Sequence, residues 1–314
     1  MTTATLSVRF AGPHVTIQDQ GRPGLMRYGV PASGPMDRQS FALANAAIGN
    51  PAGHPGIEIS LGGLSLHCLT GVVTLALVGG GFIAETNARK LGAWRILTLN
   101  AGETLTIRPG PWGSWSYLAF AGDLQAESWL GSRATHGSSG FGGGKLTADQ
   151  TLTITDAQTL PEREGPIPCP VWARPRHLLR CTLGPQDRFF SAETLNTFTS
   201  ARFETTDAFD RMGLRLRGPS VAPTNALSIP SEPILRGSVQ VSGDGVATVL
   251  LSDHQTTGGY PKITTVLSCD LDSFVQCRPR DAVMFQTVTP AESIEITRQN
   301  AQRFAAFEDR LRGR

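Results

Sequence analysis

The stretch "QTTGGYPKITTV" (Gln255–Val266) places a Gly-Gly pair and a Tyr-Pro step directly before a run of β-branched residues. Glycine allows a tight turn because it has no Cβ, and proline keeps the residue before it extended. Isoleucine, threonine and valine favour strands, so the segment predicts a turn that leads into a strand. The turn also carries more polar side chains than a plain hairpin needs.

The same alternation of short apolar runs and turn residues recurs along the chain. It predicts strands at Leu6–Phe10, Val15–Gln18, Leu64–Cys68, Val72–Val78, Arg95–Leu99, Glu103–Ile107, Trp115–Phe120, Leu178–Thr182, Val239–Val241, Thr248–Leu251, Ile263–Leu267, Val283–Gln286 and Ser293–Ile296. Short, closely spaced strands are typical of barrels or sandwiches rather than of a parallel α/β sheet. We therefore expect a mainly β fold.

Only a few short helices are expected. "MDRQSFALANAAIGN" offers Asp37 as an N-cap and Gly49 as a C-terminal stop. "FSAETLNTF" begins at Ser191, a second N-cap residue, and the tail "RQNAQRFAAFEDRLRGR" has an amphipathic pattern.

The chain has 314 residues, which is more than a single domain usually holds. The segment Leu160–His177 carries five prolines, which remove backbone donors and favour an extended linker. We therefore expect an N-terminal subdomain over residues 1–165 and a C-terminal subdomain over residues 166–314.

Composition excludes several classes of function. The formal net charge is +2 and the arginines are scattered, so neither nucleic acid nor a membrane surface is an expected partner. The five cysteines form no CxxC pair and are odd in number, which argues against a disulfide framework. We find no signal-peptide pattern, and "VVTLALVGGGFIA" is too short to span a bilayer. A soluble cytoplasmic protein is expected.

Two glycine-rich stretches resemble nucleotide-binding motifs without meeting their requirements. After Gly79, Gly81 and Ala84, the residues Asn87 and Gly92 suit a β-hairpin better than the helix that dinucleotide binding needs. In "GSSGFGGGKLT" (Gly137–Thr147) the spacing of a phosphate-binding loop fails. The six histidines show no metal-ligand spacing, so no metal or other cofactor is expected on this chain.

Three stretches concentrate polar side chains on glycine-rich turns. They are Ile17–Asp37, which holds Gln18, Asp19, Arg22 and Ser33; Leu130–Gly144, which holds Arg133; and the opening stretch, which holds Gln255, Thr256, Thr257, Gly258, Gly259, Tyr260 and Lys262. Arginine suits carboxylates, so Arg22 either ties its loop to an acidic neighbour or binds an anionic substrate. The third stretch is either a pocket wall or a turn with solvated side chains. We expect the three to meet at a cleft between the subdomains.

These stretches also carry a family likeness. "QDQGRPGLMRYGVPASGPMDRQSFALANAAIGNPAGHPGIEISLGG", "LGSRAT", "LGPQD", "DRMGLRLRGP" and "LLSDHQTTGGYPKITTVLSCDL" resemble the biotin-dependent carboxyltransferase family, also called allophanate hydrolase subunit 2. The likeness runs in the same order from about Val15 to Phe285. It implies two packed cyclophilin-like β-barrel subdomains.

The resemblance implies a member of an enzyme complex. The leading interpretation is the C subunit of the ATP-dependent 5-oxoprolinase, which opens 5-oxo-L-proline to L-glutamate together with a KipI-like and a LamB/YcsF-like subunit. ATP would be used by the complex. The alternatives are a carboxyltransferase of a urea carboxylase-like system and a KipA-type regulatory protein that antagonises a KipI-like kinase inhibitor. This chain has no "MKM"-type lysine site, so under the carboxyltransferase interpretation biotin arrives on another protein.

Roles follow for the polar residues. Asp19 or Asp37 is the candidate general base, and Lys262 an electrostatic stabiliser or proton donor. Arg22 and Arg133 are expected to contact a carboxylate or phosphate, and backbone N–H groups near Gly258-Gly259 to stabilise an oxyanion. The remaining substrate-binding candidates are Gln18, Ser33, Gln255, Thr256, Thr257 and Tyr260. His254 stands where the family commonly has arginine in "DRQTTGGYP".

Overall fold

The computed structural model describes residues 2–87, 89–184, 186–224 and 228–313. The chain divides into two compact units. Unit 1 comprises Met1–Arg22, Ser33–Arg174 and Phe304–Arg314, and unit 2 comprises Pro23–Ala32 and Pro175–Arg303. The boundary between the longest segment of unit 1 and the longest segment of unit 2 lies between Arg174 and Pro175, within the proline-rich segment expected to be a linker. The units are not two continuous halves, because a loop near the N-terminus groups with unit 2 and the C-terminal turns group with unit 1.

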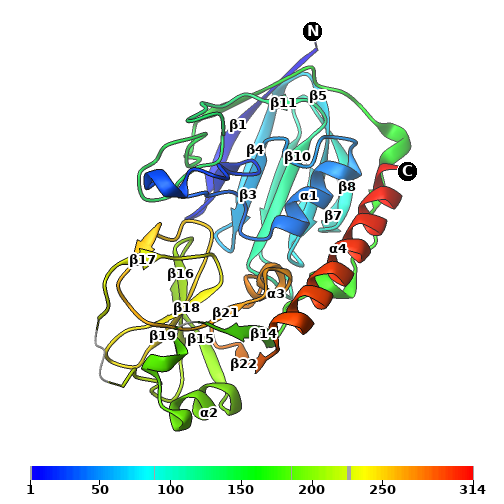
Figure 1. Ribbon diagram of the computed structural model, residues 1–314. Coiled ribbons are helices and arrows are strands. Elements are labelled where there is room, and N and C mark those ends of the chain that lie inside the picture. The colour runs from blue at the N-terminus through cyan, green and yellow to red at the C-terminus, as the bar shows by residue number, and fades with distance from the viewer. Residues whose placement is uncertain (1, 88, 185, 225–227, 314) are drawn as a thin grey trace. The chain divides into compact units, whose positions relative to one another are not determined.

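Unit 1 is built from two β-sheets (Figure 1). The first has the order β11 (Asp123–Leu124), β12 (Thr151–Thr155), β1 (Thr3–Ala11), β4 (Leu64–Thr70), β9 (Thr104–Arg108), β6 (Ile83–Glu85) and β7 (Lys90–Gly92). The second has the order β13 (Gly165–Pro166), β8 (Arg95–Asn100), β5 (Val72–Gly79), β10 (Trp115–Phe120), β3 (Gly56–Ser60) and β2 (Thr16–Gln18). The strands in both sheets pair antiparallel.

The apolar core of unit 1 lies between these sheets. Leu6 and Leu66 of the first sheet and Leu75 and Leu118 of the second are completely buried in one cluster. Side chains alternate between the two faces of a strand, so each sheet turns one apolar face to the other. The hairpin expected after Gly81 is present as β6 and β7.

Helix α1 (Arg38–Ala47) packs on the second sheet, with the Phe41 ring edge-on to Tyr117 at 5.7 Å between centroids. Asp37 is its N-cap and accepts a hydrogen bond from Ser40 N at 2.9 Å. Gly49 follows the helix with a left-handed φ of 81°, which glycine adopts at little cost. Both predicted helix ends are confirmed.

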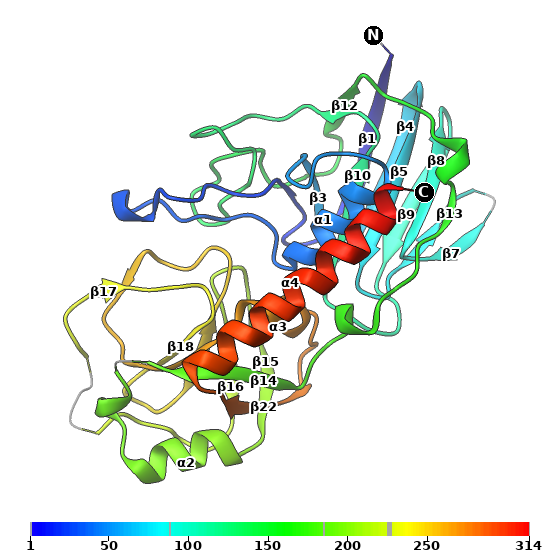
Figure 2. The same cartoon turned by 45° about the vertical axis from the view of Figure 1, so that its right-hand side comes forward.

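Unit 2 is a closed barrel (Figure 2). Its strands follow the order β14 (Leu178–Leu183), β21 (Lys262–Val266), β18 (Ser238–Val241), β19 (Ala247–Leu250), β16 (Gly213–Arg217), β15 (Phe203–Phe209) and β22 (Ala282–Thr287). The barrel closes where β14 runs parallel to β22. A separate ribbon pairs β17 (Glu232–Pro233) with β20 (Thr257–Gly258). The prediction of a mainly β fold is confirmed.

Aromatic rings fill one end of the unit 2 core. The Phe198 ring stacks on Phe285 with 4.3 Å between centroids, and Phe203 lies against both. Phe198 belongs to α2 (Ala192–Ser200), which starts at the predicted N-cap Ser191. The side chain of Ser191 accepts a hydrogen bond from Thr194 N at 3.1 Å.

The remaining helices are α3 (Ser268–Phe274), α4 (Pro290–Arg312) and the 3₁₀ turns η1 (Met26–Tyr28), η2 (Pro161–Arg163), η3 (Val171–Ala173) and η4 (Asp187–Phe189). The predicted strand Ser293–Ile296 is wrong, because these residues lie in α4. Thr289 N donates to the Glu292 carboxylate and Glu292 N donates to Thr289 Oγ1, a capping box that starts the helix well before the expected tail. None of the described helices is long and apolar enough to cross a membrane.

A buried ion pair fixes one rim of the unit 2 barrel. Arg211 Nε and Nη2 donate to the two carboxylate oxygens of Asp253 at 2.9 and 3.1 Å. The side chains are 3% and 1% exposed, so each charge lies away from water and next to its counter-charge. The pair joins the turn before β16 to the loop that leads into the opening glycine-rich stretch.

Removing one charge of this pair is expected to destabilise unit 2 strongly. Arg211→Leu leaves a buried carboxylate without its cation, and the expected loss is about 3–5 kcal/mol of unfolding free energy. Urea denaturation followed by circular dichroism measures the change. The control is Arg217→Leu, whose pairing with Glu204 at 4.0 Å is exposed to solvent and contributes less than about 1 kcal/mol. Equal midpoints for the two variants would contradict the expectation.

Candidate functional site

Asp19 joins two loops of unit 1. Its carboxylate accepts hydrogen bonds from Gly21 N at 2.8 Å, Ser132 Oγ at 2.6 Å and Arg133 N at 2.6 Å. The side chain is buried, so these donors replace the water that a carboxylate otherwise requires. The sequence predicted a polar cluster here, and the structure brings Asp19 together with the backbone of Arg133. The general-base role of Asp19 stays a prediction.

Arg22 is a buried arginine that binds backbone carbonyls. Its guanidinium donates to Trp129 O at 2.9 Å and to Ala134 O, and lies 4.9 Å from the centre of the Trp129 ring. The side chain is 2% exposed. These contacts favour a structural role in a form other than the one expected, because the guanidinium fixes the loop through backbone carbonyls, whereas the prediction named an acidic neighbour. An anion contact by Arg22 stays a prediction.

Arg133 directs its guanidinium to a carboxylate of its own chain. Nη1 and Nη2 donate to the two oxygens of Asp123 at 2.6 and 3.2 Å, and Nη1 also donates to Leu124 O. Burial raises the pKa of Asp123, but the hydrogen bond and charge of Arg133 outweigh it, so the net pKa is lowered. Arg133, which was expected to contact a substrate carboxylate, therefore already binds the carboxylate of Asp123 in its own chain.

The other predicted residues of unit 1 are buried around the same turns. Gln18 Nε2 donates to Thr16 Oγ1 and Thr135 O at 2.9 and 3.1 Å. Ser33 has a left-handed φ of 54°, and its buried Oγ makes no hydrogen bond with the part of the chain that the structure describes. Asp37 caps α1, and its general-base role stays a prediction.

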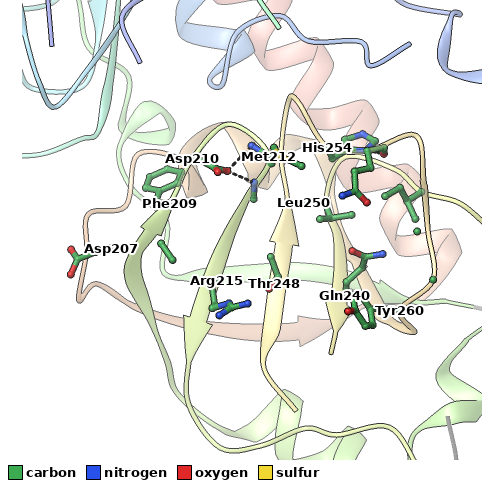
Figure 3. A pocket seen from close by; sticks show the side chains of 16 residues that line it. Asp207, Phe209, Asp210, Met212, Arg215, Gln240, Thr248, Leu250, His254 and Tyr260 are labelled. Carbon is green, nitrogen blue, oxygen red and sulfur yellow. Dashed lines mark hydrogen bonds between the residues drawn. The ribbon is translucent and has the colours of Figure 1, made fainter. Parts of the chain in front are cut away.

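The third predicted stretch lines a pocket of about 530 Å³ in unit 2 (Figure 3). Gln255, Gly258, Gly259 and Tyr260 contribute to its wall, together with outward-facing residues of the barrel strands and the turn around Asp210. Its volume lies within the range of about 300–1,000 Å³ that is common for small-molecule sites. For these four residues the geometry favours the pocket wall over a solvated turn, whereas Thr256, Thr257 and Lys262 are not among the residues that line the pocket.

Gly258 comes very close to the barrel strand β18. A Cβ added at Gly258 would lie 2.4 Å from Nε2 of Gln240, so only glycine leaves room for this amide. Gln240 lines the pocket beside Tyr260 (Figure 3). The glycine at position 258 therefore allows its main chain to lie against the side chain of Gln240. The sequence pattern alone did not identify Gln240 as this neighbour.

Lys262 lies at the start of β21, next to an acidic residue. Its Nζ is 3.7 Å from Glu232 Oε2, which is too far for a hydrogen bond. Gln186 connects the two, because its Oε1 accepts from Lys262 N at 2.8 Å and its Nε2 donates to Glu232 Oε2 at 2.5 Å. Gln186 is 1% exposed, so this bridge fixes the main chain of the lysine from behind.

The predicted residues fall into two groups. Gln18, Asp19, Arg22, Ser33, Asp37 and Arg133 belong to unit 1, and Gln255, Thr256, Thr257, Gly258, Gly259, Tyr260 and Lys262 belong to unit 2. Their meeting in one cleft stays a prediction. Within unit 2, sequence reasoning missed Gln240, Gln186 and Arg211. Gln186 lies inside the quoted motif "LGPQD" and Arg211 inside "DRMGLRLRGP", so the family likeness of these motifs could have pointed to both residues.

Comparison with known proteins places the chain among relatives of similar length. The family model described as "Carboxyltransferase domain, subdomain A and B" matches residues 28–287. A protein of Escherichia coli K12, named as the C subunit of 5-oxoprolinase, is 32% identical over 95% of this chain and 96% of its own length. A protein of Haemophilus influenzae with the same name is 29% identical over 91% of this chain and 92% of its own.

Longer relatives contain the same region as one part. A protein of Emericella nidulans named "Putative urea carboxylase" is 30% identical over 96% of this chain, which spans 25% of that protein. The crystal structure of the Kluyveromyces lactis urea carboxylase superposes with a TM-score of 0.85 over 98% of this chain and 29% of that one, at 24% identity, which supports the fold alone. With a family model covering most of its length and a relative 32% identical from end to end, this chain belongs to the carboxyltransferase domain family of subdomains A and B.

Proposed function

We propose that this chain is the C subunit of a 5-oxoprolinase, an ATP-hydrolysing enzyme complex that opens 5-oxo-L-proline to L-glutamate. In the proposal it works with a KipI-like and a LamB/YcsF-like subunit, and the complex uses ATP. The unit 2 pocket beneath Gly258 and Gly259 is the proposed substrate site.

One observation of the structure supports the proposal. Gln255, Gly258, Gly259 and Tyr260, which belong to one of the motifs that resemble the family, line the unit 2 pocket. Two relatives that align with this chain over nearly their whole length are named as the C subunit of 5-oxoprolinase. An alignment that covers 95% of this chain and 96% of the first of these relatives supports a subunit of the same kind.

The chemistry of a lactam explains what this pocket would supply. The amide of 5-oxoproline is resonance-stabilised, so opening it requires activation, which ATP would provide in the complex. When water adds to the carbonyl carbon, its π electrons move to the oxygen as negative charge, which fixed N–H donors stabilise until the C–N bond breaks and the nitrogen takes a proton. Main-chain N–H groups near Gly258 and Gly259 are the proposed donors, with Lys262 as the electrostatic stabiliser. Asp19 and Asp37 remain the proposed candidates for the general base.

The first test is omission of this chain from a reconstituted complex. Glutamate release from 5-oxo-L-proline is measured with all three purified subunits and ATP, and then without this chain. We expect release to fall to the background of the uncatalysed reaction, because the substrate pocket is missing. Full activity in its absence would reject the proposal.

A second test uses the close approach of Gly258 to Gln240. In Gly258→Ala the new methyl group displaces the Gln240 amide, and a shift of about 1 Å at a site lowers kcat/KM by about 10- to 100-fold. The matched control is Gly92→Ala in unit 1, where no atom lies within 4 Å of the added Cβ. Thermal melting of both variants separates a local change from unfolding. Unchanged kcat/KM in a folded Gly258→Ala protein would place the substrate elsewhere.

A second candidate function is carboxyl transfer from N-carboxybiotin to urea or a related amide. It is favoured by the urea carboxylase relative, which is 30% identical over 96% of this chain. The reaction needs similar groups, because an oxyanion forms on the biotin ureido ring and must be stabilised. In this candidate the biotin is carried by another protein.

Avidin separates the two candidates. Avidin sequesters biotin, so turnover that depends on carboxybiotin stops when avidin is added, and it also requires bicarbonate. For the 5-oxoprolinase function we expect glutamate release to be the same with and without avidin and without added bicarbonate. Inhibition by avidin that is absent when the avidin has first been saturated with free biotin would instead support carboxyl transfer.

A further inference from the structure

Three side chains form one transverse row across the unit 2 barrel. Arg215 pairs with Thr248 and Thr248 with Gln240, on the successive strands β16, β19 and β18. Residues directly opposite on paired strands point to the same face, and all three line the pocket (Figure 3). Lys262 on β21 is the next partner of Gln240, across a shift in the strand register, and it is not among the residues that line the pocket.

The row faces away from the barrel interior. The residues before and after it on the strands are apolar and buried, among them Leu214, Leu216, Val239 and Val241. Successive side chains of a strand alternate between faces, so a barrel filled by these apolar groups turns Arg215 and Gln240 outward. Guanidinium, hydroxyl and amide groups all donate hydrogen bonds, which makes the row a strip of donors, and the ammonium of Lys262 belongs to the strand next to its Gln240 end.

At one end of the row the donors are buried and have no acceptor. Neither Gln240 Nε2 nor Lys262 Nζ makes a hydrogen bond with any residue that the structure describes, and each atom is almost completely shielded from solvent. A buried donor without a partner costs about 1–3 kcal/mol, and more when it is charged. An acceptor oxygen of a ligand would remove this cost. Arg215, at the other end, is exposed to solvent.

The acidic groups nearby do not satisfy these donors. Glu232 Oε2 is 3.7 Å from Lys262 Nζ and receives its hydrogen bond from Gln186 instead. Asp210 accepts from Met212 N and Gly213 N at 2.8 and 3.0 Å. Asp207 lines the pocket from β15, away from Gln240 (Figure 3). The buried end of the row therefore keeps donors for an outside acceptor.

The two ends of the row offer a small ligand different groups. Neighbouring strands are about 4.8 Å apart, so the main chains at Arg215 and Lys262 are separated by about 14 Å. Arg215 is exposed at one end, and the donors without an acceptor lie at the other. The carboxylate of a five-membered lactam is an anionic acceptor with about four lone-pair directions, which matches an ammonium next to an amide N–H₂.

We infer that Gln240 and Lys262 form the subsite that binds the carboxylate of the lactam substrate, an inference that rests on the proposed function. This assignment moves carboxylate recognition from Arg22 and Arg133, whose guanidinium groups bind acceptors of their own chain, to the Gln240 side of the unit 2 pocket. It gives Lys262 the carboxylate in place of the oxyanion, which is left to the main-chain N–H groups near Gly258 and Gly259. Gln186 is then a positioning residue, because it holds the main chain of Lys262 and the carboxylate of Glu232.

The test compares two ligands that differ only in the carboxylate. Isothermal titration of the assembled three-subunit complex gives the Kd of 5-oxo-L-proline and of 2-pyrrolidinone, the same lactam without its carboxylate. For the unmodified protein we expect 5-oxo-L-proline to bind about 10- to 100-fold more tightly, the value of charge-assisted hydrogen bonds. In Gln240→Leu and in Lys262→Met the ratio of the two Kd values should fall towards one, with 2-pyrrolidinone binding retained.

Two further variants make the comparison sharper. The double variant Glu232→Gln, Lys262→Met removes both charges of the pair, so a loss of preference there cannot be ascribed to an uncompensated Glu232. Lys90→Met is the matched control, because Lys90 also lies near a carboxylate, 3.8 Å from Glu85, on an exposed edge strand of unit 1. It should keep the preference of the unmodified protein.

The outcomes separate the inference from the proposed function. An unchanged ratio in Gln240→Leu and Lys262→Met, in a complex that still releases glutamate, overturns the inference and leaves the function standing. A complex of unmodified subunits that binds neither ligand and releases no glutamate overturns both. A ratio that falls in these two variants and stays high in Lys90→Met supports the inference.

Discussion

The closure of the unit 2 barrel is the constraint on which its pocket depends. A closed barrel has one inside, and here Leu214, Val239 and Val241 are among the side chains that fill it. Because strand residues alternate, the intervening positions must face outward, where Arg215 and Gln240 stand. Pairing of β16, β19 and β18 then sets these polar groups in one row. A slip of one residue in any of these three strands would send its polar group into the core, so the same register that stabilises the barrel also aligns the donors.

Buried charges hold the surrounding loops in place. In unit 2 the Arg211–Asp253 pair joins the turn before β16 to the loop that leads into Gly258, so both sides of the pocket are tied to one ion pair. In unit 1 the Asp19 carboxylate gathers three donors from two loops in the same manner. Buried ion pairs add little net stability compared with apolar contacts, but breaking them is costly. They suit loops whose backbone must keep a defined position.

Local signals predicted much of the fold. Asp37 and Ser191 cap helices as expected, because capping is decided by a few neighbouring residues. Ser293–Ile296 was misread as a strand, since β-branched residues favour strands locally while the capping box at Thr289 and Glu292 starts a helix. The site was predicted less well. Glycine pairs and cations are visible in a sequence, whereas Gln240 carries no signal there, since its role comes from the residues paired beside it and from the close approach of Gly258.

The arginines show why charge alone is a weak guide to a binding residue. A guanidinium has five donors, and a chain with many carbonyls and carboxylates offers it acceptors close at hand. Arg22 takes such acceptors through Nε and Nη2, and Arg133 through both of its terminal nitrogens, all within unit 1. Lys262 differs, because Gln186 accepts a hydrogen bond from the main chain of Lys262 and not from its ammonium. Glu232, the carboxylate close to that ammonium in the described chain, accepts its hydrogen bond from the same glutamine. What marks a side chain as available for a ligand is thus the absence of an internal acceptor, which depends on tertiary structure rather than on residue type.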